Sequence, residues 1–203
     1  MYGHGANETK DTKIAWILLD WKLEVIKRPT YGQMLHIQTW GRQMKKFFTY
    51  RDYEIYDEDG NLCAIATSKW ALIDIEKRKM ERLTEELIKQ YQPEEKHVFS
   101  ELELDKLKMP EKFIANMKYQ VTRKDIDINK HMHNLYYLDL AYDVLPEEVY
   151  EQRPFDHVRI MYKKEIALGD VVDCHYSTSE DGKNIVVIDS QEGNALHAII
   201  ELF

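Results

Sequence analysis

Apolar and polar residues alternate along several short runs in the first third of the chain. This period-two pattern is typical of β-strands that bury one face. The alternation slips once, near Leu19. Turn-forming residues separate the runs, and the Asp-Gly pair that ends at Gly60 is typical of a β-hairpin. We therefore predict an antiparallel meander of four strands, over residues 14–27, 34–40, 47–56 and 62–73.

The pattern changes after residue 75. Leu83, Leu87 and Tyr91 recur at helical spacing, which predicts a helix over residues 80–91, and a charged stretch follows as far as Pro110. We interpret residues 76–111 as a linker that contains this short helix. The second half then predicts a strand at 117–123, a polar loop, a helix over 133–145, strands at 157–164, 171–177, 184–189 and 195–202, and turns at 180–183 and 191–194.

The two halves, residues 1–75 and 112–203, resemble each other weakly. A turn glycine lies at a matching place in each, at Gly32 and Gly169, and a Gly-Asn pair begins at Gly60 and at Gly193. The second half has a strand and a helix before its meander. Residues 2–12 are too few and too polar to supply either element, so we expect the first half to lack both.

A meander without its helix would expose an apolar face. Burial of apolar surface is worth roughly 25 cal/mol per Å², so several hundred Å² left in water would cost many kcal/mol. The tryptophans of the first half make such a face expensive to expose. We therefore expect that the natural protein extends further upstream, or that a partner chain, such as a second copy in a homo-oligomer, covers this face.

Composition excludes several classes of function. The chain of 203 residues has a formal net charge of −8 and a pI near 5.5, which argues against bulk binding of nucleic acid. No run of about eighteen apolar residues predicts a membrane span, and residues 1–13 lack the apolar core of a signal peptide. Cys63 and Cys174 have no spacing motif and are expected to be reduced, buried thiols. These features predict a cytoplasmic protein.

A dense polar cluster lies at residues 125–134, just before the predicted helix of the second half. Asp, Asn and His at such a place often serve only as helix caps and turn formers. A calcium loop is excluded because Lys130 occupies the position of the sharp-turn glycine and Tyr136 that of the bidentate glutamate. His131 and His133 could share a zinc ion only in extended chain, and further ligands are not evident. We expect no metal and no other cofactor.

Two motifs in this half resemble those of a known family. Asp127-x-Asn129-x-His131, followed by Asn134 and Tyr137, is similar to the signature of acyl–acyl carrier protein thioesterases, and the stretch from Tyr162 to Glu165 matches their Tyr-x-x-Glu motif. The resemblance implies an α+β double hotdog fold, in which a helix wrapped by an antiparallel sheet occurs twice, here with an incomplete N-terminal repeat. His133 stands where the family usually has Asn. Ile166 stands where plant members carry Cys, so no cysteine nucleophile is expected there.

The resemblance also implies roles for individual residues. The expected catalytic residues are Asp127, Asn129, His131 and Glu165. Glu165, on a strand facing the helix start, is the favoured general base, while Asp127 is an alternative base or a nucleophile. His131 would donate toward the thioester or a carboxylate and so polarise or orient that group. Asn129 would position water or substrate, and backbone N–H groups at the helix start would stabilise the oxyanion. The expected substrate-binding residues are Trp16, Trp21, Trp40, Trp70, Asn134 and Tyr137.

The resulting hypothesis is a thioester hydrolase that releases free fatty acid from acyl carrier protein in fatty acid biosynthesis. Because the carrier protein is acidic, a basic patch should dock it, and residues 27–28, 42–46 and 163–164 are candidates. Two alternatives stay open. One is a non-catalytic acyl-binding protein, a truncated relative that kept the site residues. The other is a thioesterase that acts on acyl-coenzyme A, since both substrates present the same pantetheine arm.

Overall fold

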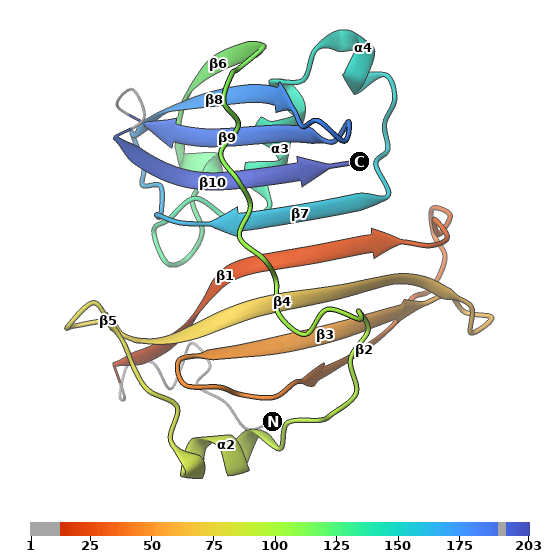
Figure 1. Cartoon of the computed structure of the whole chain (residues 1–203), viewed down its shortest axis with the longest axis vertical. Coiled ribbons are helices and arrows are strands. Elements are labelled where there is room, and N and C mark those ends of the chain that lie inside the picture. Colours follow the sequence, from red (N-terminus) through yellow and green to blue (C-terminus); the bar gives the residue numbers. More distant parts are fainter. Residues whose placement is uncertain (1–12, 191–193) are drawn as a thin grey trace. The chain divides into compact units, whose positions relative to one another are not determined.

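The computed structural model describes residues 13–190 and 194–203, which form two compact units (Figure 1). One unit ends at Leu104 and the other runs from Asp105 to Phe203. Each consists mainly of antiparallel β-strands. Within the described residues no helix is long and apolar enough to cross a membrane. Residues 2–12, on which the expectation of a missing strand and helix depends, lie outside the described part, as does most of the turn expected at 191–194.

The first unit contains the meander that the alternation predicts. Its strands pair in the order β2-β3-β4-β1, and the short strand β5 pairs with β4. The slip near Leu19 is a β-bulge, because the register of β1 against β4 shifts between Leu18 and Asp20. The strands are β1 (Ile14–Val25), β2 (His36–Gly41), β3 (Phe48–Tyr56), β4 (Leu62–Asp74) and β5 (Lys79–Met80).

The hairpin turn between β3 and β4 is organised by a fully buried carboxylate. Asp57 Oδ1 accepts hydrogen bonds from the backbone N–H groups of Asp59 (3.1 Å) and Asn61 (2.8 Å). Its Oδ2 atom lies 2.7 Å from Lys27 Nζ. Gly60 supplies the left-handed conformation, with φ +83°. Hydrogen bonds from Lys27 and Asn61 hold the pKa of Asp57 well below its usual range. The turn therefore forms where the Asp-Gly pair predicts it.

A helix of the expected linker packs on the first sheet. Helix α2 (Glu85–Tyr91) begins at Thr84, whose hydroxyl accepts the N–H of Leu87. The expected helix from residue 80 is too long, because Lys79–Met80 pairs with β4 as a strand. The apolar side chains of α2 cover β1 and β4 at one end of the sheet. This cluster contains Ile14, Trp16, Met44, Leu72, Leu83, Leu87, Ile88 and Tyr91.

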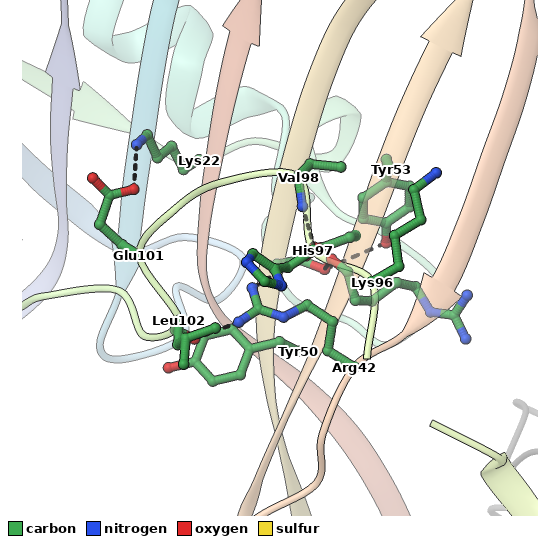
Figure 2. A network of polar contacts seen from close by, with 12 residues as sticks. Lys22, Arg42, Tyr50, Tyr53, Lys96, His97, Val98, Glu101 and Leu102 are labelled. Carbon is green, nitrogen blue, oxygen red and sulfur yellow. Dashed lines mark hydrogen bonds and ion pairs between the residues drawn. The ribbon is translucent and has the colours of Figure 1, made fainter. Parts of the chain in front are cut away.

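The chain after α2 crosses the other face of the same sheet (Figure 2). There the buried carboxylate of Asp52 accepts the N–H of Val98 at 3.0 Å and lies 3.4 Å from Arg42 Nη1. Arg42 also donates to the carbonyl of Leu102 at 2.6 Å. A buried ion pair persists only when its remaining hydrogen-bonding groups are satisfied. These contacts fasten the segment to β2 and β3.

The second unit has a sheet with the order β7-β10-β9-β8-β6, in which neighbouring strands are antiparallel. One face packs against helix α3 through Tyr137, Leu140 and Ala141. The chain near Leu107 covers the other face, against Met161 and Ile199 (Figure 1). The elements are β6 (Ala115–Gln120), η1 (Arg123–Asp125), α3 (Tyr136–Asp143), α4 (Glu147–Tyr150), β7 (His157–Tyr162), β8 (Val171–Thr178), β9 (Asn184–Ser190) and β10 (Ala195–Leu202).

Three expected boundaries in this unit are wrong. The strand expected at 117–123 ends at Gln120, because a one-turn 3₁₀ helix starts at Arg123. Helix α3 is shorter than 133–145, because His133 and Leu135 form turns before it. Strand β7 ends at Tyr162, so Glu165 lies in a loop and not on a strand. The start of α3 borders the polar loop, where side chains compete with backbone pairing.

Candidate active site

The motif loop between η1 and α3 is a tight, self-bonded turn. The N–H of Asp127 donates to the carbonyl of His131 at 2.8 Å, and the N–H of Lys130 donates back to Asp127 O at 3.1 Å. Ile126 and Met132 form a β-bridge beneath the turn. Lys130 takes the left-handed conformation that usually favours glycine, with φ +66°. The loop therefore presents Asp127, Asn129 and His131 from one short turn.

The Asp127 carboxylate is committed to the turn itself. Its Oδ1 atom accepts the N–H groups of Asn129 (2.8 Å) and His131 (3.3 Å). Its Oδ2 atom accepts from Nδ2 of Asn129 at 3.1 Å. Aspartate frequently organises turns in this way. The structure thus brings Asp127, Asn129 and His131 together, with the aspartate bonded to both of the others.

A second aspartate anchors the start of the loop. Asp125 is 2% exposed, and its Oδ2 atom accepts hydrogen bonds from Tyr119 Oη, Thr122 N and Thr122 Oγ1, at 2.8, 2.7 and 2.9 Å. Its carbonyl accepts the N–H of His133. Burial raises the pKa of Asp125, but the hydrogen bonds from Thr122 and Tyr119 outweigh it and hold the pKa below its usual value. Sequence reasoning missed this role, although the Thr122-x-x-Asp125 spacing of a capping box could have indicated it.

Glu165 approaches the motif loop from the turn that follows β7. The Nε2 atom of His131 lies 3.5 Å from Oε2 of Glu165. The two loops are joined next to this contact, since Met132 N donates to Ile166 O at 2.8 Å and His131 forms a β-bridge with Ala167. The side chains of His131 and Glu165 are 42% and 60% exposed, so both remain accessible to a substrate.

Tyr137 and Asn134 lie at the border of this contact. Tyr137 is 3% exposed, and its ring packs edge-on against Tyr162 with a centroid distance of 5.1 Å. Burial, followed by the nearby Tyr162 and Glu165, raises its pKa far above the usual value, so the phenol is neutral. Tyr162 in turn donates to the carbonyl of Asn134 at 3.1 Å. Tyr137 therefore forms an apolar floor near Glu165, while Asn134 is exposed.

Two of the four expected tryptophans share a cavity within the first unit. The cavity has a volume of about 170 Å³. Trp16 lines it and donates from Nε1 to Tyr91 Oη at 2.8 Å. Trp70 lines it and donates to Ser68 Oγ at 2.7 Å. The other lining residues are Gly41, Arg42, Met44, Thr49, Tyr50, Arg51, Tyr91 and Pro93.

The other two tryptophans lie elsewhere in the first unit. Trp21 pairs with Ser68, and therefore shares the sheet face of Trp70 further along the strands. Trp40 is on the opposite face, because it pairs with Asp52 whereas Trp70 pairs with Thr49. It is 7% exposed and donates to Lys96 O at 2.8 Å. Trp40 is thus part of the face that the segment after α2 covers.

Across residues 13–190 and 194–203, no group of three His, Cys, Asp or Glu side chains is arranged to hold a metal ion. Cys63 and Cys174 are free and buried. Burial, together with Asp173 and Asp189, raises the pKa of Cys174 to about 12, which makes it a poor nucleophile at neutral pH. The residues that the structure brings together at the site carry carboxylate, imidazole and amide groups.

The sequence matches two family models in order along the chain. Residues 2–91 match the acyl-ACP thioesterase N-terminal domain, and residues 108–203 match the acyl-ACP thioesterase C-terminal domain. The chain is 26% identical over 183 residues to oleoyl-acyl carrier protein thioesterase 2, chloroplastic, of Arabidopsis thaliana, a match that covers 85% of this chain and 50% of the relative. It is also 26% identical over 166 residues to acyl-[acyl-carrier-protein] hydrolase FATB1, chloroplastic, of Cuphea viscosissima. This match covers 79% of this chain and 40% of the relative. The chain spans about half the length of such relatives.

Solved structures show the same fold. An acyl-ACP thioesterase from Bacteroides thetaiotaomicron superposes with a TM-score of 0.83 at 22% identity, covering 99% of this chain and 81% of that one. A putative oleoyl thioesterase from Lactobacillus plantarum gives a TM-score of 0.80 at 24% identity, and the match covers 97% of this chain and 78% of that one. The fold is thus the α+β hotdog fold expected from the motifs. With both family models matched in sequence order, the chain belongs to the acyl-ACP thioesterase family.

Proposed function

We propose that this protein hydrolyses fatty acyl thioesters of acyl carrier protein and so releases free fatty acid in fatty acid biosynthesis. Family membership supports this reaction class. The observation that carries the proposal is the accessible contact between His131 and Glu165, at 3.5 Å, beside the turn that holds Asn129. A carboxylate and an imidazole in reach of each other are suited to activating water.

Glu165 is the proposed general base. Its carboxylate takes a proton from water, whose oxygen forms a bond to the thioester carbonyl carbon. The carbon–sulfur bond then breaks, and the proton passes to the departing thiolate through Glu165 or His131. His131 orients the carboxylate and donates toward developing negative charge. A positioned base of this kind contributes roughly 10²–10⁴ in rate.

Asp127 is proposed to position its neighbours. Its two oxygens accept three hydrogen bonds, which fix the side-chain amide of Asn129 and the backbone of His131. A carboxylate engaged in this way is less free to abstract a proton than that of Glu165, which is 60% exposed. Asn129 is held by its amide nitrogen and is proposed to orient the attacking water or the substrate.

The cavity lined by Trp16 and Trp70 is proposed to receive the acyl chain. Its lining includes Met44, Tyr50 and Tyr91, which suits a hydrocarbon. Its volume of about 170 Å³ is below the several hundred Å³ of typical small-molecule pockets, so it would hold only part of a long chain. Trp21 extends the same sheet face, whereas Trp40 on the opposite face is proposed to act as core.

The acidic carrier protein is proposed to dock beside Glu165. Lys163 and Lys164 directly precede Glu165 and are exposed, and Lys130 is exposed next to His131. Local positive charge of this kind steers an acidic partner despite an acidic total charge. The association rate should therefore fall as ionic strength rises. Replacing Lys163 and Lys164 by glutamine should raise KM for the carrier-protein substrate and leave kcat nearly unchanged.

One assay separates this function from its alternatives. The purified chain is incubated with acyl-acyl carrier protein and with the matching acyl-coenzyme A, and released fatty acid is measured. Faster turnover of the carrier-protein thioester supports the proposal, and preference for coenzyme A overturns the substrate assignment. Acyl-chain binding without hydrolysis would identify an acyl-binding protein. The cytoplasmic location predicted from the sequence stays a proposal, since the plant relatives are named as chloroplastic, and cell fractionation tests it.

A further inference from the structure

His197 is a buried histidine outside the thioesterase motifs. It is 2% exposed and lies in strand β10, in an otherwise apolar run. The pairing of β10 with β9 passes from Leu196↔Asp189 to Ala198↔Ile188, which makes His197 the extra residue of a β-bulge. Bulges often lie next to active sites, where they redirect a side chain. A lone histidine in a strand is ordinarily core, so its contacts decide whether it has another role.

Both ring nitrogens of His197 have partners. Nδ1 lies 3.0 Å from the carbonyl oxygen of Lys164, and Nε2 lies 3.0 Å from Ser190 Oγ. A carbonyl oxygen only accepts, so Nδ1 carries the hydrogen of the first bond. The Ser190 hydroxyl is then able to donate to Nε2. With both bonds made, the orientation of the ring is fixed.

The bonds of His197 end at the residues just before Glu165. The backbone carbonyl of His197 accepts the N–H of Lys163 at 2.8 Å, and its ring donates to Lys164. On the far side of Glu165, the carbonyl of Ile166 accepts the N–H of Met132 at 2.8 Å. The backbone on each side of Glu165 is therefore tethered, although its side chain is 60% exposed.

We propose that His197 is a positioning residue that sets the place of the Glu165 carboxylate relative to His131. The expected effect on kcat rests on the proposed hydrolase function. The hydrogen bonds that join His197 to Lys163 and Lys164 do not depend on that function. A base must be held closely for efficient proton transfer, and a displacement of about 1 Å can cost 10²-fold in rate. We assign this positioning to the hydrogen bond from Nδ1–H of His197 to the carbonyl oxygen of Lys164, and not to the volume of the imidazole ring.

Three substitutions at His197 and one at its neighbour separate hydrogen bonding from packing. His197→Asn keeps an N–H close to the place of Nδ1, whereas His197→Gln carries its amide toward the place of Nε2. His197→Leu removes both. Ser190→Ala removes the partner of Nε2 and leaves Lys164 bonded. We expect His197→Gln and His197→Leu to lower kcat about 10- to 100-fold with KM within about twofold. His197→Asn should recover most of this loss, and Ser190→Ala should stay near the wild type.

Hydrogen–deuterium exchange of the segment 163–166 gives a readout that does not need catalysis. Exchange should accelerate in His197→Gln and His197→Leu, and stay near the wild-type rate in His197→Asn. If the wild type hydrolyses no thioester while this exchange pattern appears, the proposed function fails and the tether stands. Unchanged exchange in His197→Leu would overturn the inference. Equal losses of kcat in His197→Asn and His197→Leu would overturn it too, because only packing would then matter.

Discussion

The Nε2 atom of His131 lies 3.5 Å from the Oε2 atom of Glu165, with side chains 42% and 60% exposed. Exposed ion pairs contribute about 0–1 kcal/mol to stability, so this contact does not hold the two loops together. The backbone bond between Met132 and Ile166 does so instead. Because the scaffold places the pair, either side chain can be changed with little effect on folding.

Glu165→Gln should lower kcat by at least about a hundredfold, because a neutral amide cannot accept the proton of water. The melting temperature should move little, since the side chain is 60% exposed and keeps its volume. Steady-state hydrolysis and thermal denaturation measure the two effects. Glu180→Gln makes the same chemical change in the exposed turn between β8 and β9 and should leave kcat unaltered. Near-normal kcat in Glu165→Gln would disprove the assignment of the base.

His131→Ala should abolish most activity, whereas His133→Ala should not. His131 contacts Glu165, but His133 accepts the N–H of Leu135 through Nδ1 at 3.2 Å and packs against Tyr136. Loss of this exposed hydrogen bond costs about 0.5–1.5 kcal/mol at most, so His133→Ala should lower stability only slightly. Parallel kinetics and melting curves test both variants. Equal loss of activity, or a metal found in the wild type and absent from both variants, would support a metal site instead.

Trp70→Phe should change the preference among acyl chain lengths, because Trp70 lines the cavity of about 170 Å³. Replacing indole by phenyl enlarges the cavity, so kcat/KM should shift toward longer chains. Trp40→Phe is the matched control on the opposite face of the sheet, where the indole donates to Lys96 O. It should reduce stability by about 1–3 kcal/mol through the lost hydrogen bond and leave the chain-length profile intact. The profile is measured with a series of acyl-carrier-protein thioesters, and equal shifts in both variants would argue against the cavity as the acyl site.

Asp125→Asn should destabilise the second unit in a pH-dependent way. The pKa of Asp125 is lower in the folded protein than its usual value of 3.8, so its ionised form stabilises the fold. This contribution is present above that value and is lost as the pH falls below it. The difference in melting temperature between wild type and Asp125→Asn should therefore be largest near neutral pH and shrink as pH falls below about 4. A difference that grows on acidification would contradict the assigned hydrogen bonds.

Local patterns in the sequence were sufficient to predict most of the strands and helices. Alternation fixes strands because side chains in a strand point to opposite faces, and it located even the bulge near Leu19. The Asp-Gly pair predicted the turn at Gly60, since that residue needs a positive φ. The motif spacing also identified the family, because chemistry demands particular side chains at particular positions.

Element ends and the packing of the linker helix depended on contacts between distant residues. Helix α2 lies on β1 and β4 because Trp16 and Leu72 offer it an apolar surface, which its own sequence does not reveal. Trp40 and Trp70 have the same chemistry, and only the strand register assigned them to opposite faces.

The sequence by itself determined which side chains are candidates for the site, through the spacing of Asp127, Asn129 and His131 and the later Glu165. Only the tertiary structure decided how they are arranged. It placed Glu165 on a loop beside His131, committed Asp127 to the turn, and brought His197 against the backbone before Glu165. The reason is physical: a turn is encoded by neighbouring residues, whereas a contact across a sheet depends on the register of strands that fold together.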